Sequence, residues 1–413
     1  MNLLCGPAFD KRKKRTLTLL SICFVSQEYP EETGWGGIGT YTFEMAHALA
    51  RAGHKVIVIS RALHEQQHYI EANGVEVFRI RPAFDVSSRP VVWRLNRWWE
   101  GYRLAVAIQL RQILRKRKID IIESPELHAE PLLHSLLNRR TPLVVRLHSG
   151  SEVVANFEPH HSNGSGHEAR LERWMMANAT HVTSPSKALL TATPNANFKR
   201  STVIPNPVDT DYFKPLSQPV AVDSFPNVLC VGRPRFLKGL QVLARAIPMV
   251  WEKLSEATFT FVPASMGKSG GSPADAYREI LGELLDDPRI RIVAEPVTRA
   301  NMPDYYQHAT ICVVPSLWEG FGYVCAEAMA CGVAVVASRT GGLAEIIEDE
   351  RSGVFVEPGN AEDLAEAILN LIRDPERRAR IGAGARNRIV EEFSSTAIAA
   401  RMTDLYQQVI HQA

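Results

Sequence analysis

The chain has 413 residues, of which 45% are hydrophobic and 22% are charged. This composition is typical of a globular protein with two domains, and it excludes a disordered or fibrous chain. The formal net charge is only +2, and no nucleic-acid-binding module accompanies the basic residues, so no nucleic-acid partner is expected. Residues 1–210 contain 27 Lys and Arg against 19 Asp and Glu, which gives +8. We therefore expect one of two things with equal weight: the first half binds an anionic ligand, or its solvated surface simply carries an uneven share of the basic residues.

A basic run at residues 11–15 precedes the apolar stretch Leu17–Val25, an order that also occurs in secretory signal peptides. No small-residue cleavage site follows, so the stretch is predicted to be a buried first strand. No apolar stretch reaches the ~20 residues of a membrane-spanning helix. The six cysteines form no CxxC pair, which indicates small buried residues in a reducing compartment. These features together predict a cytoplasmic protein.

Short apolar segments alternate with longer helical ones, which predicts an α/β protein with parallel sheets covered by helices. The helices expected between the strands include Tyr41–Ala52 and Ala361–Ile372. The strands predicted in the first half are Leu17–Val25, Lys55–Ser60, Val75–Arg79, Asp120–Glu123, Leu143–Leu147 and His181–Thr183. Those predicted in the second half are Asn227–Val231, Thr258–Val262, Ile290–Val293, Ile311–Val314, Val333–Ala337 and Gly353–Val356.

Prolines mark the boundary between the two predicted domains. The segment VIPNPVD at residues 203–209 is followed by a Pro- and Ser-bearing stretch to about residue 224, and these prolines forbid a continuous helix. We therefore predict an N-terminal domain over residues 1–208, a linker over 209–224 and a C-terminal domain over 225–393. Residues 394–413 are predicted to form a helix that packs back on the N-terminal domain.

Each half contains a glycine-rich loop that opens a predicted helix, Gly37-Ile38-Gly39 in the first and Gly320-Phe321-Gly322 in the second. Such a loop presents free backbone N–H groups and the positive end of the helix dipole. Two loops in facing domains suit a phosphorylated ligand in a cleft, although such turns also occur for packing alone.

Two carboxylates flank the second glycine loop. Glu319 follows a predicted strand and Glu327 lies about one turn into the next helix, so both are expected near the carboxyl end of a sheet, where ligands bind in open α/β folds. Carboxylates there can accept hydrogen bonds from sugar or ribose hydroxyls. Glu327 alone could instead be a partner of the helix dipole, whereas Glu319 lies outside the helix.

The segment PSLWEGFGYVCAEAMACG at 315–332 resembles the signature of the family 4 retaining glycosyltransferases, the group 1 glycosyltransferases of the GT-B fold. The resemblance covers nearly the whole chain. It implies two Rossmann-like parallel-sheet domains that face each other across a cleft, with the acceptor on the first and the nucleotide-sugar donor on the second. Further segments resemble the family in order, namely GGIG at 36–39, SPSK at 184–187, IPNPVDTDYFKP at 204–215, VGR at 231–233 with Lys238-Gly239, GGLAE at 341–345 and SGVFV at 352–356.

The resemblance also assigns roles to individual residues. Arg233 and Lys238 would bind the donor diphosphate, where fixed cations stabilise the charge that develops on the leaving group. His148, which follows a predicted strand, would line the donor-sugar pocket, although a lone histidine is often structural. The predicted catalytic residues are His148, Glu319, Arg233 and Lys238. The predicted donor-binding residues are Gly37, Arg233, Lys238, Glu319, Gly320, Phe321, Gly322, Tyr323, Val324 and Glu327. Among them, Glu319 and the amides of residues 320–322 would hold the transferred sugar, and Glu327 would hold the ribose.

The expected reaction is transfer of a hexosyl group from a nucleoside-diphosphate sugar to a hydroxyl of a saccharide or lipid-linked acceptor, in the synthesis of cell-surface polysaccharide or glycoconjugates. No enzymic nucleophile is evident, so a same-face substitution is favoured, in which the departing phosphate deprotonates the acceptor. The alternatives are a GT-B-fold sugar-nucleotide epimerase, a phosphorylase, or a non-catalytic subunit that binds sugar nucleotides. The segments 263–273 and 293–297 depart from the family where the base should lie, which leaves UDP, GDP and ADP open.

No metal or other cofactor is expected. Asp209-Thr210-Asp211 is a DxD sequence, but it lies in the proline-rich crossover and is interpreted as a structural turn. His160, His161 and His167 lie in a polar loop, and their loose spacing without a cysteine argues against zinc.

Tryptophans alternate with arginines in the segment WRLNRWWEGYR at 93–103. This pattern suits an anionic membrane surface and would place the protein at the inner face of the plasma membrane. An ordinary amphipathic helix with buried tryptophans is an equal alternative.

Overall fold

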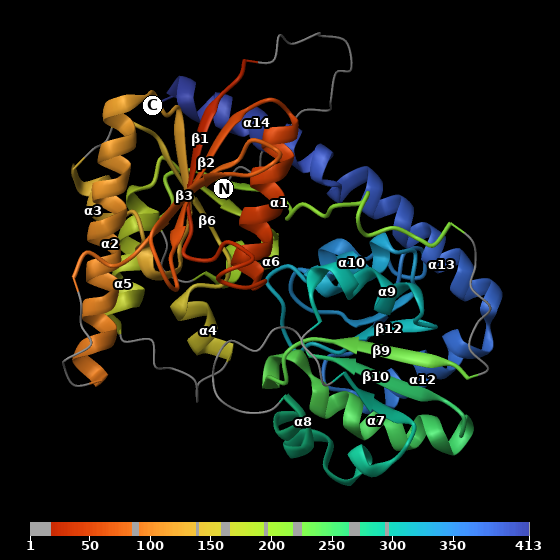
Figure 1. The fold of residues 1–413 in the computed structure, drawn as a ribbon. Coiled ribbons are helices and arrows are strands. Elements are labelled where there is room, and N and C mark those ends of the chain that lie inside the picture. The colour runs from red at the N-terminus through yellow and green to blue at the C-terminus, as the bar shows by residue number, and fades with distance from the viewer. Residues whose placement is uncertain are drawn as a thin grey trace.

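The computed structural model describes residues 18–84, 91–137, 140–157, 166–193, 197–217, 225–263, 273–293 and 297–412, with the backbone alone at 91–97 and 273–274. Two α/β domains follow one another along the chain (Figure 1), and each is built on its own sheet. This arrangement confirms the predicted fold class.

The N-terminal domain has an eight-stranded sheet of order β3-β4-β2-β1-β5-β6-β7-β8. Its strands pair in parallel, as in the alignment of Cys23 with Ile57, except that β3 is antiparallel to β4. The strands are β1 (Ser21–Val25), β2 (Lys55–Arg61), β3 (Gln67–Ile70), β4 (Glu76–Ile80), β5 (Ile121–Pro125), β6 (Leu143–Arg146), β7 (His181–Ser184) and β8 (Ser201–Val203). The helices are α1 (Gly37–Arg51), α2 (Val91–Lys116), α3 (Leu132–Leu137), α4 (Ser151–Phe157), α5 (Gly166–Asn178) and α6 (Lys187–Ala192).

Helices cover both faces of this sheet, which explains why its central strands are apolar without alternation. Ile22 and Phe24 of β1 pack in the same core cluster as α1 and the C-terminal helix. Cys23 and Val25, which point to the opposite face, pack with α2 and α5. The predicted first strand is therefore buried on both sides.

The C-terminal domain has a six-stranded parallel sheet of order β11-β10-β9-β12-β13-β14. Its strands are β9 (Asn227–Val231), β10 (Thr258–Val262), β11 (Ile290–Ile292), β12 (Ile311–Val314), β13 (Val335–Ser338) and β14 (Val354–Val356). Its helices are α7 (Leu240–Lys253), α8 (Pro273–Leu281), α9 (Met302–Gln307), α10 (Tyr323–Ala330), α11 (Leu343–Ile346), α12 (Ala361–Arg373) and α13 (Pro375–Arg388). The five described cysteines are free and buried.

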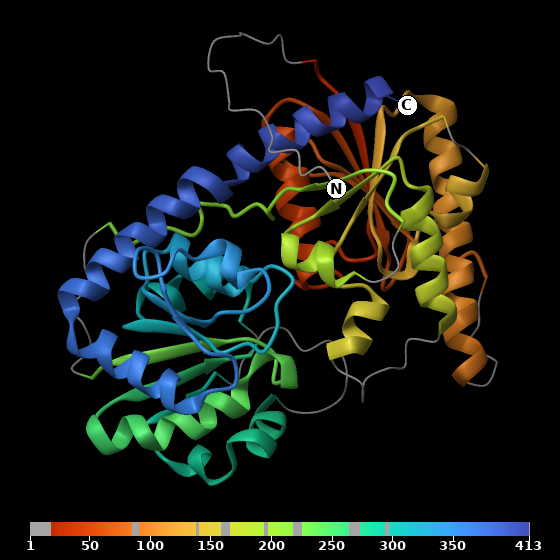
Figure 2. The ribbon, with the colours of Figure 1, turned by 180° about the vertical axis from the view of Figure 1, so that it is seen from behind.

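The chain crosses between the domains twice, and the two crossings lie side by side. Val208 donates its N–H to the Phe393 carbonyl at 2.9 Å and accepts the N–H of Ser395 at 2.9 Å. Helix α14 (Ser395–Gln412) then runs back along the N-terminal domain beside α1 (Figures 1 and 2). There the Tyr406 hydroxyl donates to the buried carboxylate of Glu123 at 2.6 Å.

Several predicted boundaries differ from those in the structure. Helix α1 begins at Gly37, four residues before the predicted Tyr41, because the glycine loop itself forms the first turn. Strand β13 begins two residues after the predicted Val333. Strands β3 and β8 were not predicted, since both are short edge strands whose residues are partly exposed and lack an apolar run.

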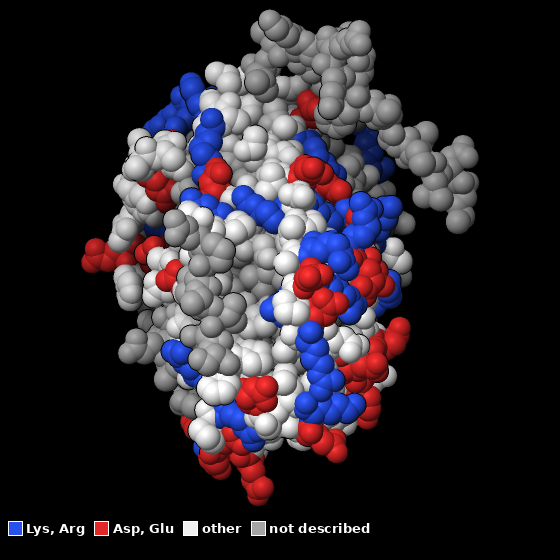
Figure 3. Space-filling view, turned by 90° about the vertical axis from the view of Figure 1, so that its right-hand side faces the viewer, with Lys and Arg blue, Asp and Glu red and all other residues white. Residues whose placement is uncertain are grey.

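Acidic and basic side chains are interleaved on the face shown in Figure 3. Ion pairs in the C-terminal domain, such as Arg377–Glu350 at 2.7 Å and Arg388–Glu348 at 2.6 Å, join side chains of opposite sign. Within the described part of the chain, no helix is long and apolar enough to cross a membrane.

Candidate active site

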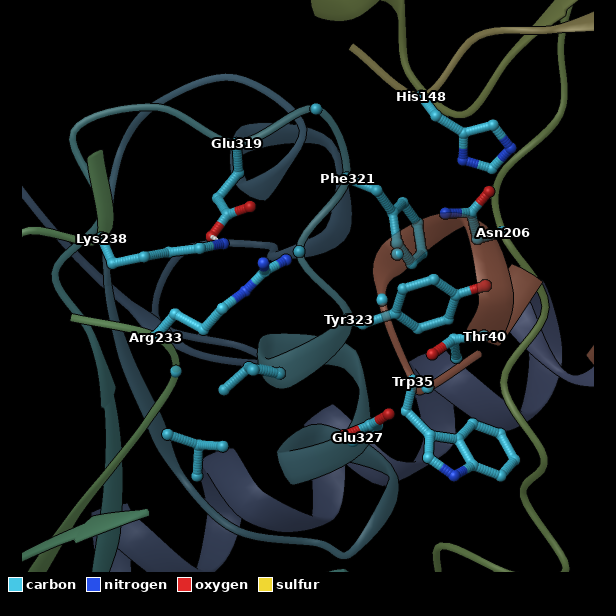
Figure 4. A pocket seen from close by; sticks show the side chains of 18 of the residues that line it. Trp35, Thr40, His148, Asn206, Arg233, Lys238, Glu319, Phe321, Tyr323 and Glu327 are labelled. Atoms are coloured by element: carbon cyan, nitrogen blue, oxygen red, sulfur yellow. Dashed lines mark hydrogen bonds and ion pairs between the residues drawn. The ribbon is translucent and has the colours of Figure 1, made fainter. Parts of the chain in front are cut away.

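A cavity of about 410 Å³ lies between the two domains (Figure 4). Its walls combine loops at the carboxyl ends of strands from both sheets with the first turns of α1 and α10. The structure brings every predicted site residue to this one cavity, namely Gly37, His148, Arg233, Lys238, Glu319, Gly320, Phe321, Gly322, Tyr323, Val324 and Glu327.

Lys238 and Glu319 form an ion pair in the cavity wall. The Lys238 Nζ lies 2.6 Å from Glu319 Oε1, and the Ser316 hydroxyl donates to the same oxygen at 3.0 Å. Lys238 ends a 3-10 turn that is closed by Gly239 at φ +68°. A Cβ on Gly239 would lie 1.8 Å from the Pro315 carbonyl oxygen, so only glycine permits this approach.

Arg233 follows β9 and points toward the Lys238–Glu319 pair (Figure 4). Gly232 before it has φ +152°, a conformation that favours glycine. Burial raises the pKa of the Glu28 carboxyl on the facing domain, and the positive charge of Arg233 partly offsets this effect. Two cations therefore lie on one wall of the cavity.

The first turns of α1 and α10 also reach the cavity, and their N-cap residues, Gly36 and Gly322, have no side chain that could cap the helix. In α1 the Gly39 N–H donates instead to Glu28 Oε2 at 3.2 Å. A Cβ on Gly36 would lie 2.4 Å from a Glu28 oxygen, and Gly322 has φ +114°. No described atom lies within 4 Å of a Cβ on Gly37. The remaining first-turn N–H groups and the two positive helix ends therefore favour an anion here.

Glu327 lies one turn after the start of the eight-residue helix α10 and is partly buried where it lines the cavity. Burial raises the pKa of this carboxyl to about 7, while the charge of Arg299 and the Tyr306 hydrogen bond act in the opposite direction. The Tyr306 hydroxyl donates to Glu327 Oε2 at 2.8 Å. The carboxylate is thus available as an acceptor for a ligand hydroxyl.

His148 follows β6 on the N-terminal side of the cavity (Figure 4). Its backbone N–H donates to both oxygens of the buried Glu126, at 2.7 and 2.9 Å, and its ring meets that of Tyr41 with centroids 5.0 Å apart. Burial, aided by the charge of Arg146, holds the pKa of His148 well below its usual range. The imidazole is therefore neutral at pH 7, and its buried Nε2 has no partner among the described residues.

Some residues of the cavity were not predicted from the sequence. Arg299 lines it, forms an ion pair with Glu44 of α1, and lies over the ring of Trp35 at 4.8 Å. Asn206 accepts a hydrogen bond from the buried Arg146 at 2.6 Å. The Asn-Pro sequence of the crossover is a visible signal for Asn206, but nothing near Arg299 points to Glu44, 255 positions away.

The DxD sequence forms a turn. Asp209 Oδ1 accepts the N–H groups of Asp211 and Tyr212, each at 3.1 Å, and Oδ2 lies 3.7 Å from Arg51. No group of three or more His, Cys, Asp or Glu side chains in the described ranges is placed to hold a metal ion. His160 and His161 lie outside the described residues, whereas His167 lies in α5.

The tryptophan- and arginine-rich segment belongs to α2. Trp98 and Trp99 are partly buried against the core of the N-terminal domain, and Trp99 stacks on His128 with ring centroids 3.6 Å apart. These two tryptophans pack inward, as the amphipathic-helix alternative expects. Beyond this segment, toward the C-terminal end of α2, the basic side chains of Arg111, Arg115 and Lys116 are exposed, and the exposed Arg117 and Lys118 follow the helix.

The chain is similar in sequence to known glycosyltransferases. A model described as glycosyltransferase family 4 matches residues 35–212, and one described as glycosyl transferases group 1 matches residues 225–374. The chain is 29% identical, over 90% of each chain, to D-inositol 3-phosphate glycosyltransferase of Pseudarthrobacter chlorophenolicus. It is 36% identical to D-inositol 3-phosphate glycosyltransferase 2 of Catenulispora acidiphila over 51% of each chain.

Two solved structures share the fold. Sucrose-phosphate synthase from Thermosynechococcus elongatus superposes with a TM-score of 0.81 at 24% identity, over 95% of this chain and all of that one. Anabaena HepE in complex with UDP-glucose superposes with a TM-score of 0.70 at 20% identity, over 94% of this chain and all of that one.

Proposed function

Because the chain belongs to the family 4 glycosyltransferases and has the GT-B fold, we propose that it transfers a hexosyl group from a nucleoside-diphosphate sugar with retention of configuration. The observation that carries this proposal is the position of Arg233 and Lys238 in a cavity that also receives the N-terminal turns of two helices, α1 and α10. A diphosphate is the group that this arrangement fits best.

The leaving nucleoside diphosphate gains negative charge as the glycosidic bond breaks. Fixed cations and helix dipoles stabilise that state more than the ground state, and so they lower the barrier. In this proposal Arg233, Lys238 and the Gly37 amide supply this stabilisation without a divalent ion. Nucleotide binding that is unchanged by a chelator would support this part of the proposal.

The transferred sugar would lie between Glu319 and His148. The Lys238 amine and the Ser316 hydroxyl hold one oxygen of Glu319, which orients the carboxylate for a sugar hydroxyl. His148, being neutral, can exchange a hydrogen bond with another hydroxyl of the sugar. Retention would proceed by substitution on one face, with a departing phosphate oxygen taking the proton of the acceptor hydroxyl.

The acceptor would approach from the N-terminal domain, which lines the cavity with Glu28, Thr33 and Ser149. We infer a hydroxyl of a saccharide or lipid-linked saccharide, in the synthesis of cell-surface polysaccharide or glycoconjugates. The exposed basic residues of α2 would serve a membrane-bound acceptor at the cytoplasmic face of the membrane. Flotation with anionic liposomes tests that part, and equal flotation with neutral liposomes would contradict it.

A thermal-stability screen against UDP, GDP and ADP and their sugar conjugates, with and without EDTA, tests the donor site. A ligand at ~100 times its Kd adds about 2.7 kcal/mol to the free energy of unfolding. We expect one nucleoside diphosphate to raise the melting temperature, with no change in EDTA. Lys238→Ala should abolish the shift, whereas Lys253→Ala, on an exposed helix end, should retain it. No shift with any nucleotide would contradict the proposal.

Incubation with the donor alone separates the related activities. A sugar-nucleotide epimerase would change the sugar without an acceptor, and a phosphorylase would require free phosphate. A protein that binds the donor but transfers nothing to any acceptor would be a non-catalytic subunit.

A further inference from the structure

Tyr306 of α9 is a fully buried side chain in the C-terminal domain. Its ring meets that of Phe213 edge-on, with centroids 6.1 Å apart. A buried phenol requires a partner for its hydroxyl. The partner of Tyr306 in the described structure is a single atom, Oε2 of Glu327, at 2.8 Å.

The two oxygens of Glu327 have different surroundings. Oε2 is held by Tyr306, whereas Oε1 makes no hydrogen bond within the described chain and is not among its buried unpartnered atoms. Because Glu327 lines the cavity and its carboxylate points toward the side occupied by Trp35 and Thr40 (Figure 4), Oε1 is the oxygen that a ligand can reach. The Tyr306 phenol therefore holds Oε2 of Glu327 and leaves Oε1 free to bind a ligand.

We propose that Tyr306 is a positioning residue, which holds the Glu327 carboxylate so that Oε1 faces the ribose hydroxyls of the bound nucleotide. This inference rests on the proposed function, in which Glu327 binds the ribose. A glutamate side chain has several rotatable bonds, and ordering it costs free energy that must be recovered from binding. A hydrogen bond made before the ligand arrives removes much of that cost.

The charge near Glu327 comes from a different residue. The charge of Arg299 lowers the pKa of Glu327, but the Arg299 side chain is held by its ion pair with Glu44 and by the surrounding aromatic rings. Arg299 thus favours the ionised form of Glu327, whereas the direction of the carboxylate depends on Tyr306. Replacing Tyr306 by phenylalanine removes the hydroxyl alone and leaves Arg299 and the core volume as they are.

The test measures binding of the nucleoside diphosphate that the wild type binds among UDP, GDP and ADP, together with its 2′-deoxy and 3′-deoxy analogues, by calorimetry. The wild type should bind at least one deoxy analogue about tenfold more weakly than the ribonucleotide, which is about 1.4 kcal/mol. Tyr306→Phe should lose about five- to tenfold in affinity for the ribonucleotide, and its affinity for that analogue should stay within twofold of the wild type. Glu327→Gln combined with Tyr306→Phe should lose no more than Glu327→Gln alone.

Tyr277→Phe is the matched control, because it also removes one buried phenol hydroxyl from this domain, at 2.8 Å from the Gly232 carbonyl near the cations. Any effect of Tyr277→Phe should be equal for the ribonucleotide and the deoxy analogue. Equal losses for both ligands in Tyr306→Phe, or no loss for either, would overturn the inference. If the wild type binds none of the nucleotides, the proposed function itself fails. That outcome is visible in the wild type without any variant, so it is distinct from failure of the inference on Tyr306.

Discussion

Lys238 and Glu319 lie 81 positions apart in the sequence, yet the Lys238 amine is 2.6 Å from a Glu319 carboxylate oxygen. The ion pair joins the loop after β9 to the loop after β12, two neighbouring strands of the C-terminal sheet. In the proposed function it also joins the group that binds the phosphates to the group that binds the sugar. A change at one should therefore affect both parts of the donor.

Lys238→Ala should reduce kcat/KM by about 10²–10³-fold, the loss seen when one preorganised electrostatic contact to a transition state is removed. The free energy of unfolding should change by no more than about 1 kcal/mol, because a partly exposed ion pair contributes little to stability. Steady-state kinetics and urea denaturation measure the two effects. A loss of stability large enough to explain the lost activity would show that the lysine acts through folding.

Gly239→Ala should destabilise the protein more than a glycine substitution at a comparable backbone angle. An alanine at positive φ costs about 1–2 kcal/mol, and forcing the Cβ away from the Pro315 carbonyl adds about 1–3 kcal/mol. Gly74→Ala is the matched control, since Gly74 has φ +89° but no described atom within 4 Å of its Cβ position. Equal midpoints of urea denaturation for the two variants would contradict the close approach at Pro315.

Glu327 should make the protein less stable as the pH rises from about 4.3, the ordinary value for an unfolded glutamate, to about 7, the pKa of the folded carboxyl. In this window the folded state keeps a proton that the unfolded chain has released. The stabilisation is complete below the unfolded pKa and is lost as the pH rises through the folded pKa, by up to about 1.4 kcal/mol per pH unit.

Glu327→Gln should remove this contribution, because an amide does not titrate. Urea denaturation of both proteins between pH 4.5 and 8 gives the difference in stability at each pH. The wild type should lose stability relative to the variant as the pH rises. Parallel curves would show that the Glu327 carboxyl has the same pKa in the folded and the unfolded protein.

The sequence predicts which residues lie at the carboxyl ends of the strands better than it predicts contacts between elements that are distant in the chain. Arg233 and His148 follow apolar strands, and the carboxyl ends of such strands point toward the cleft in a doubly wound fold, so their meeting in one cavity follows from local patterns. The ion pair of Arg299 with Glu44 and the hydrogen bond of Tyr306 with Glu327 depend on how helices pack after folding. Neither residue type nor spacing indicates those partners.

Ser186 links the two domains directly, next to Pro185 and Gly320 of the cavity wall. Its hydroxyl donates to the Gly320 carbonyl across the cleft at 2.7 Å and accepts the N–H of Leu189 at 3.0 Å, as the N-cap of α6. Ser186→Ala should therefore lose about 0.5–2 kcal/mol of stability as a cap and also weaken the contact that holds the Gly320 loop. We expect kcat/KM to fall about tenfold, which is about 1.4 kcal/mol.

Asn360→Ala provides the matched control for Ser186→Ala. Asn360 caps α12 by accepting the N–H of Asp363 at 3.0 Å, entirely within the C-terminal domain. The two variants should lose similar stability in urea denaturation, but only Ser186→Ala should lose activity. Small-angle scattering should also show a larger radius of gyration for Ser186→Ala, since one bond that holds the domains together is gone. Equal activity in both variants would mean that the Ser186–Gly320 contact contributes only to helix capping.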